Sequence, residues 1–378
     1  MFNRCRKLLL NGFTAQIAVV LAFLAVFVYL ALRDYPRHDF VCYWSSSQLL
    51  AGGHNPYDPS AIRQIEHSVG FSEGGPAFIM RNPPLVLPLV APLAYFPLKV
   101  AILLWAGLML TLASLACWLL TRNCPEKRDL LIYFAPLLIC LWNGQSTTIV
   151  LFAVALFLCL WRKRPVASGL LLSLTSIKPH LLLLFWPVLA LDCIRRRDWR
   201  IPAGVLAGTA ALAAISFGLH PHAWAQYRAA MNQQGIGTQF LANVSAELRF
   251  LLFPRLPWVQ FIPSLVGLVA ALIWYARTPD WKWTTHGALL VGLSAVLSPY
   301  SWTYDLALVL PAVLTLPATE KVRQCVILAS LMTLLPLEWT RVWASPAMSF
   351  AGVFWVGWYC LARFRFSQPA PVCDPALG

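Results

Sequence analysis

The segment LLIYFAPLLICLWNGQSTTIVLFAVALFLCLW, residues 130–161, decides the fold because two apolar runs flank a polar centre. Its 32 residues exceed the roughly 20 that one straight transmembrane helix needs. A single helix would also bury Asn143-Gly144-Gln145 at mid-bilayer, where polar groups are costly. The segment therefore predicts a hairpin of two membrane-crossing arms, with this motif at the turn.

Two later segments have the same form. Residues 166–194 hold Lys178-Pro179-His180 near their centre, and residues 284–318 hold Ser-Pro-Tyr-Ser-Trp-Thr-Tyr-Asp at 298–305. Each is again too long for one crossing and would bury its polar motif. The arms are only 13 to 16 residues long, which predicts bent or partly submerged helices, or a locally thin bilayer.

The basic residues predict the topology. Of 29 Lys and Arg residues, 19 fall in seven short clusters between apolar runs. If every cluster faces the cytoplasm, the positive-inside rule holds throughout, and two crossings join each neighbouring pair. This predicts one domain over residues 1–378: an all-α polytopic bundle of about 12 transmembrane helices, with a first helix at 17–32 and both termini cytoplasmic. The clusters are Arg4/Arg6/Lys7, Arg122/Lys127/Arg128, Arg162/Lys163/Arg164, Arg195/Arg196/Arg197/Arg200, Arg277/Lys282, Lys321/Arg323 and Arg363/Arg365.

Composition excludes other classes. The 378 residues are 59% hydrophobic and 12% charged, whereas soluble domains carry about 25% charged residues. The apolar runs are continuous rather than alternating, which excludes a β-barrel. The net charge of +14 comes mostly from basic residues in the connections between apolar runs, where they set the membrane topology. No nucleic-acid partner is therefore expected.

Two long segments are predicted to lie outside. The first periplasmic loop covers residues 34–97, and the second large one covers residues 218–258. Within the first, Pro83–Phe96 is apolar but too short to cross the bilayer. Residues Pro59–His67 have the composition of an amphipathic helix, which we expect to help roof a site.

This topology gathers polar side chains from separate segments on the outer face. They suit glycosyl transfer from a polyprenyl-phosphate sugar, whose leaving group is a stabilised phosphate. That reaction needs one carboxylate to accept the proton of the acceptor hydroxyl, and cations to hold the phosphate. The gathered residues are Asp39, Arg81, Gln145, Lys178, His180, Tyr304 and Asp305.

By role, Asp39 is the candidate base, and Lys178 and Arg81 are the candidate phosphate ligands. A single base facing the leaving group across the sugar predicts inversion at the anomeric carbon. Aromatic residues near these positions would stack on a sugar or line a lipid entrance. They are Tyr43, Trp44 and Trp302.

Each of these residues could also have an ordinary structural role. An aspartate near a helix end is often a cap, and this is the preferred interpretation of Asp305. A lysine before proline is often an interfacial anchor, and Gln145 after a glycine is often a turn residue. His220 and His222 are two histidines without a third ligand, so no metal site and no cofactor beyond the donor are expected.

Taken in order, the motifs resemble glycosyltransferase family 87, within the C-type superfamily of multi-spanning enzymes. The resemblance runs from about residue 30 to residue 315. The motifs are Asp39-Phe-Val-Cys-Tyr-Trp44, Gly52-Gly-His-Asn-Pro-Tyr-Asp58, Asn82-Pro-Pro84, Asn143-Gly-Gln-Ser-Thr147, Ile177-Lys-Pro-His180 and Ser298-Pro-Tyr-Ser-Trp-Thr-Tyr-Asp305.

The resemblance implies a polyprenyl-phosphate-mannose-dependent α-mannosyltransferase. It implies that Asp39 matches the catalytic base and that Lys178 sits near the donor phosphate. The chain departs from the family after the Ser-Pro-x-Ser-Trp motif, where members often carry histidine and this chain has Tyr304-Asp305. A phosphate contact by that histidine would here be unfilled or pass to His180 or Arg81.

We therefore predict a hexosyltransferase of the bacterial inner membrane with a periplasmic active site. It would move a hexose, in the first instance mannose, from a polyprenyl-phosphate sugar to a glycan or glycolipid acceptor at the surface of the lipid bilayer. The alternatives are a transporter or flippase of lipid-linked sugars, and a scaffold without chemistry. A transporter usually places ionisable groups at the bilayer midplane, often within repeats, and neither feature is visible here.

Overall fold

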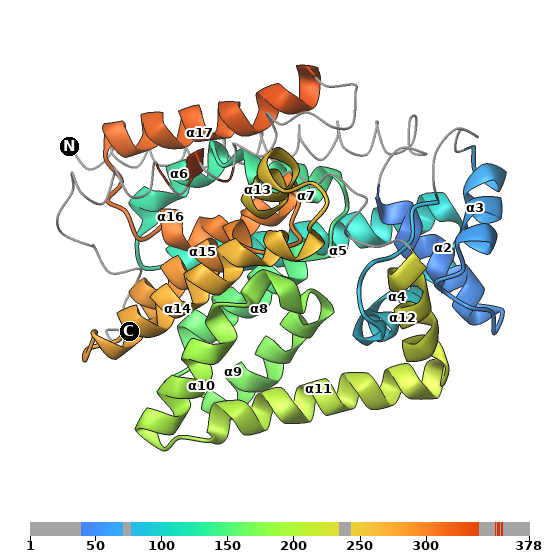
Figure 1. Ribbon diagram of the computed structural model, residues 1–378, viewed down its shortest axis with the longest axis horizontal. Coiled ribbons are helices and arrows are strands. Elements are labelled where there is room, and N and C mark those ends of the chain that lie inside the picture. The colour runs from blue at the N-terminus through green and yellow to red at the C-terminus, as the bar shows by residue number, and fades with distance from the viewer. Residues whose placement is uncertain are drawn as a thin grey trace, which may run out of the picture.

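The computed structural model describes residues 39–70, 77–233 and 243–339, with four further positions at 352, 354, 355 and 357. All regular structure in these ranges is helical (Figure 1), which confirms the all-α fold class. The predicted first helix at 17–32 and the C-terminal basic cluster lie outside the described residues.

The first half of the described chain begins with two loop helices and continues into the long α5. Its elements are α2 (Phe40–Ala51), α3 (Pro59–Ser68), η2 (Pro84–Val86), α4 (Leu87–Val90), η3 (Ala91–Tyr95), α5 (Leu98–Thr121), η4 (Pro125–Lys127), α6 (Arg128–Ile132), α7 (Ala135–Trp142) and α8 (Thr147–Leu160).

The second half alternates short, broken helices with longer ones. In the view of Figure 1, α11 runs along the lower edge and α17 along the upper edge, with α8 and α15 between them. The elements are α9 (Pro165–Leu172), η5 (Ser173–Ile177), η6 (Pro179–Leu182), α10 (Phe185–Arg196), α11 (Arg200–Leu219), α12 (Ala223–Gln233), α13 (Val244–Leu252), η8 (Pro257–Phe261), α14 (Ile262–Ala276), η9 (Trp283–Gly287), α15 (Ala288–Val296), η10 (Thr303–Val309), α16 (Leu310–Val313) and α17 (Glu320–Trp339).

Three of the described helices are long and apolar enough to cross a membrane: Leu98–Thr121, Arg200–Leu219 and Pro257–Ala276. Their composition identifies a membrane protein. Shorter apolar helices, such as Thr147–Leu160 and Pro165–Ile177, match the expectation of short arms. The number of about 12 spans stays a prediction.

The centre of residues 130–161 forms a turn between α7 and α8. Gly144 has φ of +63°, a left-handed conformation that glycine adopts without strain. A Cβ at this position would lie 3.1 Å from the Cβ of Phe40 in α2. The indole of Trp105 donates a 2.7 Å hydrogen bond to the carbonyl of Gly144. This turn therefore fixes the residues that follow it, beginning with Gln145.

The segment 166–194 is broken where the basic motif lies. Lys178 has φ of −140° and ψ of 64°, and it separates η5 from η6. Pro179 explains the break, because proline disfavours the α conformation in the residue before it. Lys178 consequently lies between two helical turns rather than within a continuous helix.

The helices α9 and α11 pack with their backbones in close contact. A Cβ on Gly204 would lie 2.2 Å from the carbonyl oxygen of Val166, and one on Gly169 would lie 2.2 Å from that of Ile201. Gly208 completes a Gly-x-x-x-Gly pattern on α11, a pattern that permits such close approach between membrane helices. Because α9 leads through η5 to Lys178, this packing sets the position of the lysine.

The predicted helix at Pro59–His67 is present as α3. Asp58 caps it, since its side chain accepts hydrogen bonds from the backbone of Ser60 and Ala61. At the other end, Glu66 Oε1 accepts a 2.9 Å hydrogen bond from the backbone N–H of Phe78. This bond connects α3 to the segment that begins at residue 77 and includes Arg81 and Asn82.

Candidate active site

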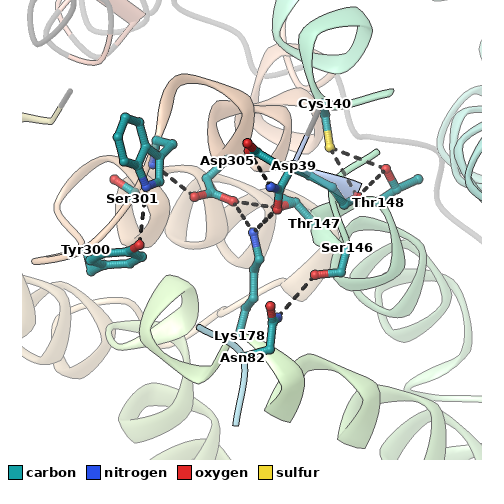
Figure 2. Close-up of polar contacts among 12 residues, drawn as sticks. Asp39, Asn82, Cys140, Ser146, Thr147, Thr148, Lys178, Tyr300, Ser301 and Asp305 are labelled. Carbon is teal, nitrogen blue, oxygen red and sulfur yellow. Dashed lines mark hydrogen bonds and ion pairs between the residues drawn. The ribbon is translucent and has the colours of Figure 1, made fainter. Parts of the chain in front are cut away.

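Lys178 is at the centre of a buried polar cluster. Its Nζ lies 3.0 Å from Asp305 Oδ1, 2.9 Å from Thr147 Oγ1 and 3.0 Å from Gln145 Oε1. Figure 2 shows the lysine side chain extending toward Asp305 and Thr147. Only 8% of the lysine side chain and 1% of the aspartate side chain are exposed. Three segments far apart in the sequence therefore meet at one ammonium group.

Gln145 connects this ammonium group to Asp39. Its Nε2 donates a 2.7 Å hydrogen bond to Asp39 Oδ2, while its Oε1 accepts from Lys178. Asp39 and Lys178 are consequently held at the two ends of a single amide group. A carboxylate and a cation from different segments therefore lie close together.

Asp305 uses its two oxygens for different purposes. Oδ2 accepts a 2.9 Å hydrogen bond from the backbone N–H of Trp302, which caps η10. Oδ1 forms the ion pair with Lys178 and also accepts from the hydroxyl of Thr147. The predicted capping role is therefore correct for one oxygen, and the other neutralises the candidate phosphate ligand.

A second layer of side chains holds Gln145 in place. The hydroxyl of Tyr43 lies 3.3 Å from Gln145 Oε1 and 3.0 Å from Ser146 Oγ. Asn82 Nδ2 donates to Ser146 Oγ at 3.2 Å and to the carbonyl of Ile177 at 2.9 Å. These bonds connect the first loop, the α7–α8 turn and the backbone immediately before Lys178.

Asp39 stands at the start of α2 but makes no capping hydrogen bond with its side chain. It is half-buried. Burial raises the pKa of this carboxyl above its ordinary value, the hydrogen bond from Gln145 and the charge of Lys178 lower it, and the charge of Asp305 raises it. Burial is the largest effect. A raised pKa moves a carboxylate toward the range in which a general base accepts a proton effectively.

Aromatic rings surround the cluster. Lys178 Nζ lies 4.9 Å from the ring centroid of Tyr304, and the rings of Tyr304 and Trp302 stack with centroids 6.4 Å apart. The guanidinium of Arg81 lies 5.8 Å from the ring centroid of Tyr300. These rings place Arg81 and Lys178 on neighbouring aromatic faces of one motif, Ser298–Asp305.

His180 lies beside this motif, with its ring 5.4 Å from that of Tyr300. Burial lowers the pKa of His180 to about 4; Asp305 acts in the opposite direction and Lys178 in the same one. Its Nε2 is buried and has no hydrogen-bond partner among the residues that the structure describes. The imidazole is therefore neutral near pH 7, and the positive charge of the site comes from Lys178 and Arg81.

Two of the predicted aromatic contacts have other partners. The indole of Trp44 donates to the carbonyl of Phe96 at 3.1 Å, outside the cluster. The ring of Tyr43 is only 1% exposed and packs on Trp105, with centroids 5.3 Å apart. Tyr43 therefore supports Gln145 from behind and has no open face for a sugar.

His220 and His222 lie with ring centroids 6.3 Å apart, and His220 hydrogen-bonds Gln226. Among the residues that the structure describes, no group of three or more His, Cys, Asp or Glu side chains is arranged to hold a metal ion.

Three residues of the cluster were not proposed from the sequence: Asn82, Ser146 and Thr147. Asn82 belongs to the Asn-Pro-Pro motif, and the other two follow Gln145 directly. All three therefore lie within motifs that the sequence analysis had already identified. The pairing of Asp305 with Lys178 joins residues 127 positions apart, and no local pattern predicts it.

Comparison with protein families gives a match to the model of glycosyltransferase family 87 over residues 80–299. This is more than half of the chain. The chain belongs to glycosyltransferase family 87. It is accordingly a glycosyltransferase, and its apolar helices make it a membrane protein.

The family match contains Arg81, Gln145 and Lys178, while Asp39 and Asp305 lie on either side of it. The geometry joins the two aspartates to the matched region through Gln145 and Lys178. Comparison with curated proteins and with solved structures gave no match.

Proposed function

We propose that this family 87 enzyme is an inverting hexosyltransferase that uses a polyprenyl-phosphate sugar, with mannose as the first candidate hexose. The acceptor is a glycan or glycolipid, and the site faces the periplasm of a bacterial inner membrane. The observation that carries the proposal is the Asp39–Gln145–Lys178 chain, which holds a carboxylate and a cation one amide group apart.

In the proposed reaction, Asp39 accepts the proton of the acceptor hydroxyl as the oxygen attacks the anomeric carbon. The bond from that carbon to the phosphate oxygen breaks, and polyprenyl phosphate leaves with the bonding electrons. Negative charge develops on the leaving phosphate, where Lys178 and Arg81 stabilise it. Attack from the face opposite the phosphate inverts the configuration.

The raised pKa of Asp39 supports this role, because the proton acceptor gains basicity while Gln145 keeps the carboxylate oriented. Lys178 is paired with Asp305. A donor phosphate would therefore share the ammonium group with Asp305, which makes donor binding weaker and release of the phosphate product easier than at an unpaired lysine.

The test is an assay with the purified full-length protein and a panel of radiolabelled polyprenyl-phosphate hexoses, with glycan and glycolipid acceptors. We expect transfer from a polyprenyl-phosphate hexose with inversion, read from the linkage of the product, and no transfer from nucleotide sugars. Transfer from a nucleotide sugar would refute the donor class. Movement of intact labelled donor across proteoliposomes without a new glycosidic bond would identify a flippase instead.

A further inference from the structure

An open, arginine-rich pocket lies between the end of α10 and the start of α11. Its volume is about 670 Å³. Its lining combines arginines with apolar side chains, and it shares no residue with the Asp39 cluster. The lining residues are Val166, Arg196, Arg197, Asp198, Trp199, Arg200 and Ala203.

This pocket is at the other end of α8 from the candidate active site. Thr147, the first residue of α8, donates to Asp305, whereas Arg196 lies 5.3 Å from the ring of Trp161, directly after the last residue of α8. A helix of 14 residues is roughly 21 Å long. The pocket and the Asp39 cluster are therefore separate sites.

The pocket region has an excess of positive charge. Arg196 is paired with Asp192 at 2.8 Å, and Arg200 is paired with Asp198 at 2.8 Å. Arg195 contacts the ring of Tyr275 at 5.7 Å. With Arg197, the segment 192–200 carries four arginines against two aspartates, which leaves a formal charge of +2.

Arg197 holds an unfavourable backbone position. Its φ is +54° and its ψ is 34°, the left-handed conformation that ends α10. Glycine or asparagine usually occupies this position, because a Cβ is strained there. Among the described non-glycine residues, Arg197 is the one with positive φ. An arginine at such a position suggests that its charge has a function beyond ending the helix.

The surroundings identify the kind of anion. The helix that starts at the pocket, Arg200–Leu219, is a candidate membrane span, and its side chain Leu206 is 72% exposed. Trp199 is 60% exposed and Val166 is 52% exposed beside the arginines. Arginines at the start of a lipid-facing helix, next to an exposed tryptophan, lie at the depth of phospholipid headgroups.

We propose that this pocket binds the phosphate headgroup of an anionic phospholipid, with the acyl chains lying along α11. Arg197 would contact phosphate oxygens, which guanidinium groups bind with two parallel hydrogen bonds. Arg200 stays paired with Asp198 through Nε and Nη2 and borders the site. Arg196 stays engaged with Asp192 and Trp161 and forms the wall of the pocket. This binding does not depend on the proposed transfer reaction.

The experiment uses native mass spectrometry of the full-length protein with titrated phosphatidylglycerol or phosphatidylcholine. We expect the wild-type protein to retain phosphatidylglycerol in preference to phosphatidylcholine. Arg197→Gly removes the charge and also relieves the backbone strain, so we expect it to bind phosphatidylglycerol about fivefold more weakly, the effect typical of one basic residue near a membrane surface. Arg197→Lys keeps the charge and should retain the preference.

Arg197→Asn provides a second variant that tolerates the left-handed conformation, in case Arg197→Gly loosens the end of α10. Folding of each variant is checked by its thermal midpoint in phosphatidylcholine. Equal retention of the two lipids by the wild type, or unchanged retention by both uncharged variants, would overturn the proposal. So would displacement of the lipid by soluble glycerol phosphate at equal concentration, which would identify a site for free phosphate.

Discussion

Lys178 and Asp305 form an ion pair of 3.0 Å with both side chains almost fully buried. The pair lies at the centre of the candidate site, and it joins the break before Pro179 to the start of η10. Buried ion pairs contribute little net stability, but removal of one partner leaves an uncompensated charge. The pair therefore fixes the local structure of the site and also regulates how strongly Lys178 attracts an anion.

The stability of this pair can be tested with single and double variants. Loss of one partner of a buried pair typically costs about 3–5 kcal/mol, so Asp305→Leu should strongly lower the thermal midpoint. The double variant with Lys178→Met should recover part of the loss, since apolar replacement of both partners is often neutral. Thermal unfolding in one detergent gives the comparison.

The control is the exposed pair of Arg323 and Glu320, 2.6 Å apart with 31% and 63% of the side chains exposed. Glu320→Gln should change the free energy of unfolding by less than about 0.5 kcal/mol. Two results would contradict the claim that losing one partner leaves a costly uncompensated charge. In one, Asp305→Leu is no more destabilising than Glu320→Gln; in the other, the double variant is less stable than both single variants.

Substitutions of Lys178 and of Asp305 should change the KM for the donor in opposite directions. Lys178→Ala removes a charged contact worth roughly 1.5–3 kcal/mol, so KM for the donor should rise about 10- to 150-fold. Asp305→Asn keeps an oxygen to accept from Trp302 but removes the competing negative charge, so KM should fall. Lys178→Arg, which keeps the charge, should lie between wild type and Lys178→Ala. A KM that is unchanged in Lys178→Ala would refute phosphate contact by this residue.

The raised pKa of Asp39 predicts a pH dependence of turnover. A base must be deprotonated, so kcat/KM should fall as the pH drops through a pKa that burial has raised above the ordinary value of about 3.9. The hydrogen bond from Gln145 lowers this pKa, so Gln145→Met should move the acidic limb to higher pH. Were Gln145 only structural, kcat/KM would decrease by the same factor at every pH and the limb would stay in place.

The close packing of α9 on α11 predicts an effect on stability. A Cβ on Gly204 would approach the carbonyl oxygen of Val166 and the backbone of Leu170, so Gly204→Ala must push the helices apart. We expect a lower thermal midpoint and reduced activity, because α9 leads to Lys178. Gly218 on the same helix has open space around it, so Gly218→Ala serves as the control and should be near neutral. Equal midpoints for the two variants would contradict the packing argument.

Local features of this fold were predictable from the sequence. The helix predicted at Pro59–His67 and the turn predicted at Asn143–Gln145 both arise from interactions within a few residues. The break at Lys178 also follows from a local cause, the proline after it. The turn at Gly144 and the break at Lys178 thus fall within two of the polar motifs that interrupt the apolar runs.

Which turns meet was not predictable in the same way. The partner of Lys178 is 127 residues away, and its second oxygen is occupied by an ordinary helix cap. Sequence reasoning recognised the cap at Asp305 because capping is local, and it missed the ion pair because tertiary packing creates it. The burial of Tyr43 behind Gln145, and the neutral state of His180, likewise depend on neighbours from distant segments.

The most direct measurement of the central claim compares Asp39→Asn with Asp58→Asn in steady-state transfer, donor binding and thermal unfolding. Asparagine caps helices about as well as aspartate, so Asp58→Asn should keep α3 intact and behave as wild type. Asp39→Asn should lower kcat by about 10²- to 10⁴-fold with donor binding retained. Because its folded-state pKa is raised, ionised Asp39 destabilises the protein at neutral pH, so the variant's thermal midpoint should equal or exceed that of the wild type. Turnover by Asp39→Asn equal to that of Asp58→Asn would contradict the assignment of Asp39 as the base.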